Sequence, residues 1–237
     1  MKILWYGYFV IYLIVTSFWR IKLTSLKKRS KVEAELYAYG KAKKISKHIM
    51  KISKTTSEVR GINNIPEGPC LFVANHQAIV DAFLMVGYID KPFGFIAKKE
   101  IEKIPLVRSW LRDMNTVFMD REDVRESIKS INIGIETLKR GYSMAIFPEG
   151  TRSLKSEMGD FKKGSMKLAL KAGVPVVPIT IDGTYKVLEV GRKVSGHTVT
   201  MVVHKPIYVN KLTKEEQSNL SDTVHQIIED ELIIIRQ

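Results

Sequence analysis

Short apolar runs that alternate with helix-like segments constrain the fold of this chain more than any other feature. The runs predict strands at Glu58–Ile62, Cys70–Val73, Gly94–Ala97, Val117–Met119, Ser143–Phe147, Val176–Ile181 and Val199–His204. Helical periodicity predicts helices at Asp81–Tyr88, Leu106–Asp113, Val124–Lys139, Ser165–Ala172 and Thr213–Ile234. Such alternation is typical of α/β proteins. The sequence therefore predicts one layered α/β domain over residues 55–237, with a central, mostly parallel sheet flanked by helices.

A segment of different character, residues 1–54, precedes this domain. Residues Ile3 to Trp19 carry no charge. As a helix they would span about 25 Å, which is short for the roughly 30 Å hydrocarbon core of a bilayer. Bulky or basic residues follow the run, which disfavours a cleaved signal peptide. The run predicts a helix that either spans a membrane or enters one leaflet.

Most of the net charge of +13 lies directly after this run. Residues Arg20 to Lys54 contain twelve Lys or Arg against two acids, Glu33 and Glu35. Such a cluster suits either nucleic acid or an anionic membrane surface, and the adjacent apolar run favours the membrane. The positive-inside bias then places the cations and the following domain on the cytoplasmic face of a cell membrane.

A second N-terminal helix is predicted at Lys31–Ser53. Its apolar side chains recur every three or four residues and so share one face: Val32, Leu36, Tyr39, Ala42, Ile45, Ile49 and Ile52. Lysines occupy the other faces. A basic amphipathic helix of this kind either lies on a membrane surface or packs on its own domain, and its position beside an apolar anchor favours the membrane.

Polar side chains follow the predicted strands, where the sites of parallel sheets form. His76 and Asp81 come after the strand at Cys70–Val73. A histidine can take a proton from an alcohol when a carboxylate holds its other ring nitrogen. Five residues of regular helix would place the two side chains about 140° apart. They meet only if His76 lies in the loop and Asp81 in the first helical turn.

Cationic side chains follow three other predicted strands. Arg152 follows Gly150 and Thr151 after the strand at Ser143–Phe147, and Glu149 can orient Arg152 or bind a substrate hydroxyl. Arg121 and Lys98 follow two further strands. Arginine is suited to phosphate, because its planar guanidinium forms paired hydrogen bonds. Together these cations predict an anion pocket beside a histidine base, which fits a phosphate-bearing alcohol as the nucleophile.

Other sequence signatures for catalysis are missing. The chain has no G-x-S-x-G serine elbow, no P-loop, no dinucleotide fingerprint and no His/Cys metal spacing. Its one cysteine, Cys70, cannot form an internal disulfide and lies in an apolar run, so it is predicted to be a small buried side chain. A covalent acyl-enzyme is therefore not indicated.

The polar motifs, in their order along the chain, resemble the 1-acylglycerol-3-phosphate acyltransferases, or lysophosphatidic acid acyltransferases. The matching pieces are Asn75-His76-x4-Asp81, Ala97-Lys98-Lys99-Glu100, Phe118-x2-Arg121, Phe147-Pro148-Glu149-Gly150-Thr151-Arg152-Ser153 and Val174-Pro175-Val176-Val177-Pro178-Ile179. They extend over nearly half of the chain. Two positions depart from the pattern: Ala78 replaces a common serine, and Asn115 replaces a common glycine.

The resemblance implies a function and a set of site residues. His76 and Asp81 would be the catalytic pair. Lys98, Arg121, Gly150, Thr151 and Arg152 would hold the acceptor's phosphate, and Asn75 and Glu149 would bind or orient the substrate. An acyl group would pass from acyl-acyl carrier protein or acyl-CoA to the sn-2 hydroxyl of 1-acylglycerol 3-phosphate, giving phosphatidic acid. No metal or other cofactor is expected.

Two alternatives remain at this point. A related acyltransferase could use another acceptor, such as glycerol 3-phosphate or a different lysophospholipid. A basic, non-enzymatic protein that binds membranes or nucleic acid would explain the charge of Arg20–Lys54, but it would not explain a histidine and three cations at successive strand ends. The expected partners are therefore a phospholipid membrane, lysophosphatidic acid and a thioester donor, with no nucleic acid.

Overall fold

The structure is a computed structural model that describes residues 2–189, 194 and 196–237. Its α-helices are α1 Lys2–Thr16, α2 Trp19–Arg29, α3 Lys31–Ile52, α4 Val80–Tyr88, α5 Pro105–Asp113, α6 Val124–Lys139, α7 Lys167–Ala172, α8 Tyr185–Leu188, α9 Lys214–Ser218 and α10 Leu220–Ile235. Its strands are β1 Thr56–Arg60, β2 Leu71–Ala74, β3 Phe93–Lys98, β4 Val117–Met119, β5 Ser143–Ile146, β6 Val176–Asp182 and β7 Thr198–Val203.

Within the described residues, the seven strands form one sheet in the order β1-β7-β6-β2-β5-β3-β4. Every neighbouring pair is parallel except β6 and β7, which are antiparallel. Each predicted strand is present to within two residues at either end. The prediction of a mostly parallel α/β sheet is therefore confirmed.

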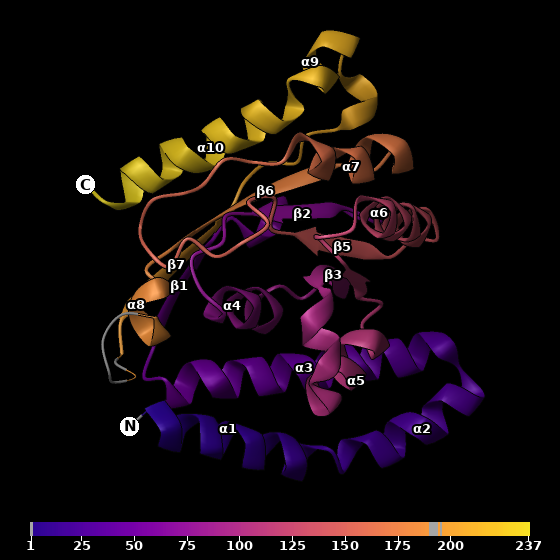
Figure 1. Ribbon diagram of the computed structural model, residues 1–237, viewed down its shortest axis with the longest axis vertical. Helices are drawn as coiled ribbons and strands as arrows, with labels where there is room; N and C mark the ends of the chain where they lie inside the picture. Colours follow the sequence, from indigo (N-terminus) through magenta and orange to yellow (C-terminus); the bar gives the residue numbers. More distant parts are fainter. Residues whose placement is uncertain (1, 190–193, 195) are drawn as a thin grey trace.

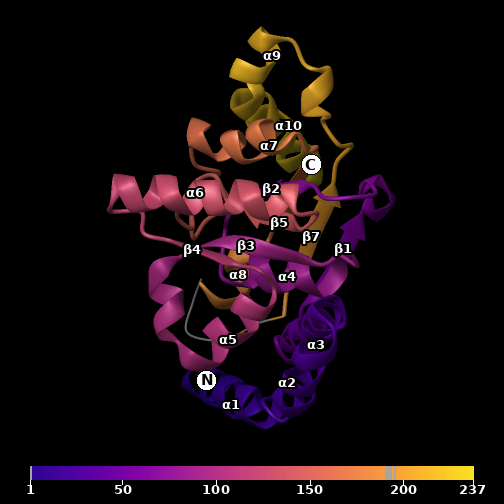
Figure 2. The same cartoon turned by 90° about the vertical axis from the view of Figure 1, so that its right-hand side faces the viewer.

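Helices cover both faces of this sheet (Figures 1 and 2). On one face α4 packs against the sheet and α3 packs outside it, with buried side chains such as Leu84 and Ile89 in this core. On the other face α6, α7 and α10 build a second core with Leu138, Leu168 and Ile228. Successive residues of a strand point to opposite faces, so Met144 and Ala145 of β5 contribute to different cores.

Local signals in the sequence explain where several of these elements begin and end. Asp123 caps α6 by accepting hydrogen bonds from the backbone N–H groups of Arg125 and Glu126. Gly141, just after the helix, has a φ of 93° that favours glycine. Asn115 has a φ of 57° before β4, and asparagine tolerates this conformation better than most residues. This explains how asparagine can occupy a position at which the family resemblance led us to expect glycine.

The N-terminal segment differs from its prediction in one respect. The run Ile3 to Trp19 is not one helix, because α1 ends at Thr16 and α2 begins at Trp19, with a bend of 44° between them. At the bend, Thr16 and Ser17 donate side-chain hydrogen bonds to backbone carbonyls of the preceding turn, including that of Leu13. Such bonds compete with the helical ladder and often bend helices.

The predicted helix at Lys31–Ser53 is present as α3, but most of its apolar face packs on the protein. Tyr39, Ala42, Ile45 and Ile49 are buried against neighbouring helices, whereas Val32 and Leu36 are exposed. The phenol of Tyr39 donates a hydrogen bond to the carbonyl of Ile89 after α4. Of the two alternatives for this helix, a membrane surface and its own domain, the structure thus favours packing on the domain.

The outer surface of α1 is strongly apolar. Its exposed large side chains are Ile3, Leu4, Tyr6, Tyr8, Val10, Ile11, Ile14 and Val15. Among the described residues, no single helix is both long and apolar enough to cross a membrane, and only the bent pair α1–α2 meets the length and composition needed. An apolar surface of this extent is uncommon on a water-exposed protein and marks a contact surface.

Candidate active site

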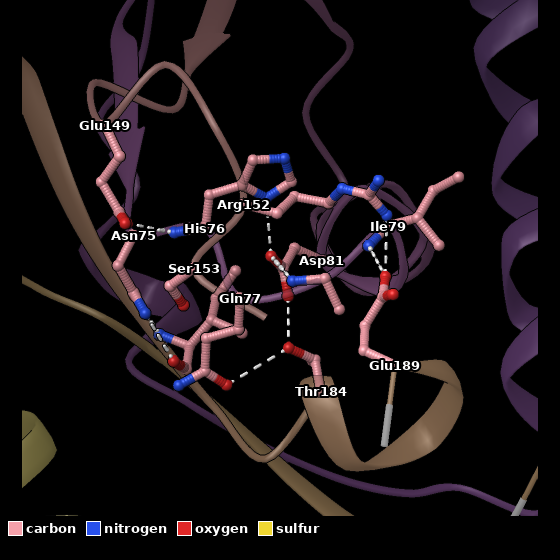
Figure 3. A network of polar contacts seen from close by, with 12 residues as sticks. Asn75, His76, Gln77, Ile79, Asp81, Glu149, Arg152, Ser153, Thr184 and Glu189 are labelled. Atoms are coloured by element: carbon pink, nitrogen blue, oxygen red, sulfur yellow. Dashed lines mark hydrogen bonds and ion pairs between the residues drawn. The ribbon is translucent and has the colours of Figure 1, made fainter. Parts of the chain in front are cut away.

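Three loops meet at the carboxyl edge of the sheet. Because β2 lies between β5 and β6, with Val73 opposite Ile146 and Ala74 opposite Ile179, the chain leaves all three strands at the same edge. Residues 75–79 follow β2, residues 147–154 follow β5, and residues 183–184 follow β6 (Figure 3). The backbone N–H of Ser153 donates to the carbonyl of His76 at 2.8 Å, which ties two of these loops together.

His76 and Asp81 are in direct contact. Nδ1 of His76 lies 2.7 Å from Oδ2 of Asp81, with His76 in the loop and Asp81 in the first turn of α4. This is the arrangement that the five-residue spacing required. The imidazole also stacks on the ring of Phe147, with ring centroids 3.9 Å apart. Nε2 lies on the side of the imidazole away from Asp81 (Figure 3).

The Asp81 carboxylate is fully buried and has further hydrogen-bond donors. The backbone N–H of Ala78 donates to Oδ2 at 2.8 Å, and the Thr184 hydroxyl donates to Oδ1. Thr184 lies directly before α8 and is itself buried. Thr184 is not among the site residues predicted from the sequence, although it lies just beyond the end of β6, as the other site residues lie beyond the ends of their strands.

A polar network extends from Thr184 to the end of the chain. The Thr184 hydroxyl lies 3.3 Å from the Gln77 side-chain oxygen, and the Gln77 amide donates to Asp182 at 3.0 Å. Arg236, after α10, donates to the same Asp182 oxygen at 2.6 Å and to the carbonyl of Ser156 at 2.6 Å. The loop that carries His76 is therefore linked through side chains to β6 and to the C-terminal helix.

Asn75, predicted to bind or orient substrate, instead joins β2 to β6. Its side-chain NH₂ donates to the carbonyl of Ile181 at 2.8 Å, and its side-chain oxygen accepts from the N–H of Ile181 at 2.7 Å. The side chain is buried. Because both ends of the amide are used in this way, Asn75 fixes the start of the His76 loop.

Glu149 also has a different environment from the one predicted. Its carboxylate accepts hydrogen bonds from the backbone N–H groups of His76, at 2.6 Å, and Gly159, at 2.9 Å. It does not orient Arg152, which pairs instead with Glu189 at 2.8 Å; binding of a substrate hydroxyl by Glu149 stays a prediction. Burial raises the pKa of Glu149, although the two N–H donors oppose this shift. Glu149 therefore acts as a brace between two loops.

The predicted phosphate-binding residues have different neighbours in the structure. Arg121 donates a hydrogen bond to the carbonyl of Gly150, and both residues line a cavity of about 400 Å³. Arg152 lies on the α8 side, where Glu189 holds it, and Lys98 pairs with Glu100 at 3.1 Å. Burial lowers the pKa of Arg121. Gly150 adopts a φ of 75° at the turn, and Thr151 beside it is exposed.

No cluster of three or more His, Cys, Asp or Glu side chains suited to a metal ion occurs in the part of the chain that the structure describes. Cys70 is buried, as predicted, just before β2. Its sulfur lies 3.7 Å from the Ser143 hydroxyl, and burial raises the pKa of the thiol. A thiol in this state is less nucleophilic at neutral pH, because less of it is thiolate.

Comparisons with known proteins show what this chain is similar to. The model of the family described as Acyltransferase matches residues 56–182, a range that includes every predicted site residue. A chloroplastic 1-acyl-sn-glycerol-3-phosphate acyltransferase of Arabidopsis thaliana is 36% identical over 173 residues, which cover 70% of this chain and 48% of that protein. A 1-acyl-sn-glycerol-3-phosphate acyltransferase of Borreliella burgdorferi is 33% identical over 181 residues, covering 75% of this chain and 72% of that protein.

A solved structure extends the likeness to nearly the whole chain. The crystal structure of the 1-acyl-sn-glycerophosphate (LPA) acyltransferase from Thermotoga maritima superposes with a TM-score of 0.86 at 30% identity. The match covers 98% of this chain and 93% of that one. By contrast, the chain spans about half the length of the plant relatives that it matches.

Proposed function

Since the chain belongs to the acyltransferase family, we propose that it transfers a fatty acyl group from a thioester to the sn-2 hydroxyl of 1-acylglycerol 3-phosphate. The product is phosphatidic acid. The observation that carries this proposal is the contact between His76 and Asp81 at the carboxyl edge of the sheet. It leaves Nε2 of the imidazole as the basic nitrogen for an incoming alcohol.

The reaction uses His76 as a general base and forms no acyl-enzyme. Nε2 takes the proton of the sn-2 hydroxyl while the hydroxyl oxygen attacks the thioester carbonyl carbon. The new C–O bond forms, the tetrahedral intermediate collapses, and the C–S bond breaks. The proton on Nε2 passes to the departing sulfur, which leaves as a free thiol. Asp81 holds Nδ1 and stabilises the imidazolium through the cycle.

The phosphate of the acceptor is held by cations beyond the strand ends. Arg121, placed by its hydrogen bond to Gly150, lies in a partly desolvated position where its charge acts strongly on a nearby anion. Arg152 has a side chain that is 43% exposed while it pairs with Glu189, so part of its guanidinium is open to a ligand. Lys98 and the Gly150–Thr151 backbone complete the proposed set.

The apolar surface of α1 supports a location on the cell membrane, with the domain on the cytoplasmic face. Lys27, Lys28 and Arg29 form the last turn of α2, and each well-placed cation contributes about 1 kcal/mol at an anionic leaflet. Both the lysolipid and the product have acyl chains that remain in the bilayer. The thioester donor, acyl-acyl carrier protein or acyl-CoA, is water-soluble and requires no metal.

An assay of phosphatidic acid formation with the purified chain tests the proposal. His76→Ala should lower kcat by about 10²–10⁴-fold, as loss of a general base typically does. His225→Ala is the matched control, because His225 lies on α10 and contacts Glu229 rather than the dyad. Turnover of His76→Ala equal to that of His225→Ala would refute the mechanism.

A panel of acceptors tests the substrate. Lysophosphatidic acid should be acylated faster than glycerol 3-phosphate, a lysophospholipid with a larger headgroup, or the phosphate-free monoacylglycerol. Arg121→Ala should raise the KM for lysophosphatidic acid and leave the KM for monoacylglycerol unchanged. Equal turnover of the phosphate-free acceptor by the unmodified chain would contradict the assignment of a phosphate site.

A further inference from the structure

The cavity beside Arg121 opens on a different face of the sheet from the dyad. Its inner wall is apolar and includes Ile96 and Ile146, whose side chains belong to the core under α6, α7 and α10. Ile128 and Ile131 of α6 line another side. The dyad lies on the α4 face. Phe147 belongs to both places, because it lines the cavity and stacks on His76.

The charged side chains that line this cavity in the described part of the chain are all cationic. Lys162, Lys167 and Lys171 line it together with Arg121, and none of its described lining residues is acidic. These three exposed lysines make no ion pair with the described part of the chain, whereas the adjacent Lys163 approaches Asp222 at 3.9 Å. A Cβ placed on Gly150 would lie 2.9 Å from Nζ of Lys162, so this ammonium group borders the loop that follows β5.

The position of the cavity indicates from which side a ligand arrives. Helices α1, α2 and α3 lie beyond the α4 face of the sheet, whereas α6 and α7 lie on the opposite face (Figures 1 and 2). A lysolipid that enters from the apolar surface of α1 approaches the dyad from the α4 side. A ligand in the cavity approaches it from the opposite side, which on the proposed orientation faces water.

We propose that this cavity receives the phosphopantetheine arm of the acyl-thioester donor, and that Lys167 and Lys171 hold its phosphate. The assignment rests on the proposed function. Acyl-CoA and acyl-acyl carrier protein both present the thioester at the end of this arm, which combines one phosphate with an uncharged, partly apolar chain. The cavity offers matching parts: a cationic rim, an apolar wall and a border, at Phe147, with the base.

Lys167 and Lys171 are suited to one phosphate because they lie four residues apart on α7, where side chains of a helix are neighbours. Charge-assisted hydrogen bonds to phosphate are stronger than bonds between neutral groups. Arg121 donates a hydrogen bond to the carbonyl of Gly150, and it keeps its assignment to the phosphate of the acceptor. The two substrates are thus recognised by different cations, although Arg121 also lines the cavity that receives the donor.

The double variant Lys167→Ala/Lys171→Ala tests this assignment against the matched variant Lys139→Ala/Lys163→Ala. The control also removes two exposed lysine charges, but neither lysine lines the cavity. KM should be measured for hexadecanoyl-CoA and for hexadecanoyl-acyl carrier protein at saturating lysophosphatidic acid, and then for lysophosphatidic acid at saturating donor. We expect a rise of about tenfold in both donor KM values, with the acceptor KM and kcat near those of the control.

Inhibition by fragments of the donor gives a second readout. In the unmodified chain, 4′-phosphopantetheine should compete with hexadecanoyl-CoA about tenfold better than pantetheine, and the double variant should lose this difference. Unchanged donor KM values, a rise in the acceptor KM instead, or an effect confined to one of the two donors would overturn the assignment. Failure of the unmodified chain to acylate lysophosphatidic acid from either donor would instead overturn the proposed function.

Discussion

Asp81 has hydrogen-bond donors on both carboxylate oxygens, and only one of these donors is the imidazole of His76. The backbone N–H of Ala78 shares Oδ2 with His76, and the Thr184 hydroxyl donates to Oδ1. Each bond restricts the rotation of the carboxylate. The direction in which Asp81 presents Oδ2, and hence the orientation of the ring, therefore depends on Thr184 as well as on α4.

Thr184→Val should lower kcat while the KM values of both substrates change little. Valine keeps the shape of threonine but removes the hydroxyl, and a hydrogen bond to a charged, buried group contributes about 1.5–3 kcal/mol, or roughly 10- to 100-fold in rate if it is needed to position Asp81. Steady-state kinetics measure this effect. Thr184→Ser keeps the hydroxyl and should remain within a few-fold of the unmodified chain, and equal activity of the Val and Ser variants would contradict this role.

The one contact within the site that the sequence could predict joins two residues that lie close together along the chain. His76 and Asp81 share one short loop and helix turn, so their spacing allowed a contact provided that His76 lay in the loop, and the family resemblance implied the pair. The partners of Asn75, Glu149 and Arg152 could not be predicted in this way, because Ile181, Gly159 and Glu189 are brought to them by the order of the strands. Polar side chains that appeared free to bind substrate are used to hold one loop to another.

At the scale of elements, α6 depends on a close approach to its neighbours. Gly134 is buried in this helix, and a Cβ there would lie 2.7 Å from Cδ2 of Leu168 on α7 and 3.1 Å from Cδ1 of Ile96 on β3. Leu168 is fully buried, so it has little room to move away. Glycine at this position therefore sets the distance between α6 and the sheet.

Gly134→Ala should lower the free energy of unfolding by up to about 2 kcal/mol, because overpacking typically costs about 1–3 kcal/mol and alanine returns up to about 1 kcal/mol in helix propensity. Gly40→Ala in α3 is the matched control. A Cβ at Gly40 would meet no atom within 4 Å, so this change should stabilise the protein slightly. Urea unfolding followed by circular dichroism measures both, and a stabilised Gly134→Ala would contradict the packing argument.

The fold of the whole molecule was more predictable than its details. All the predicted strands follow from short apolar runs, which are continuous in buried strands such as β2 and β6, and the α/β layers follow from the alternation of these runs with helical periods. The antiparallel pairing of β7 could not be predicted, because it depends on where the chain returns rather than on the composition of the strand. The break between α1 and α2 and the separation of α9 from α10 at Asn219 could not be predicted either, because both lie within otherwise helical runs.

Acid should destabilise the molecule partly through His204. Burial lowers the pKa of this imidazole below its usual 6.5, although Glu231 opposes the shift, and Nε2 lies 2.8 Å from the Thr180 hydroxyl between β7 and β6. As the pH falls through 6.5, the unfolded chain takes up a proton that the folded imidazole does not, so stability is lost until the lower folded pKa is reached.

His204→Gln should therefore lose less stability than the unmodified chain between pH 7.5 and pH 5.5. The measurement is the free energy of unfolding in urea at both pH values. Other groups titrate equally in the two proteins, so the difference between the two losses reports His204. An identical loss in both proteins would exclude His204 as a source of the acid sensitivity.

The stacking of His76 on Phe147 has a consequence for the reaction as a whole. A ring fixed on one flat side by Phe147 and on one edge by Asp81 has already lost most of its rotational freedom before any ligand arrives. Binding of substrate then requires little further ordering of the base. The loss of entropy that ordering the imidazole requires therefore occurs when the chain folds and not in each catalytic cycle.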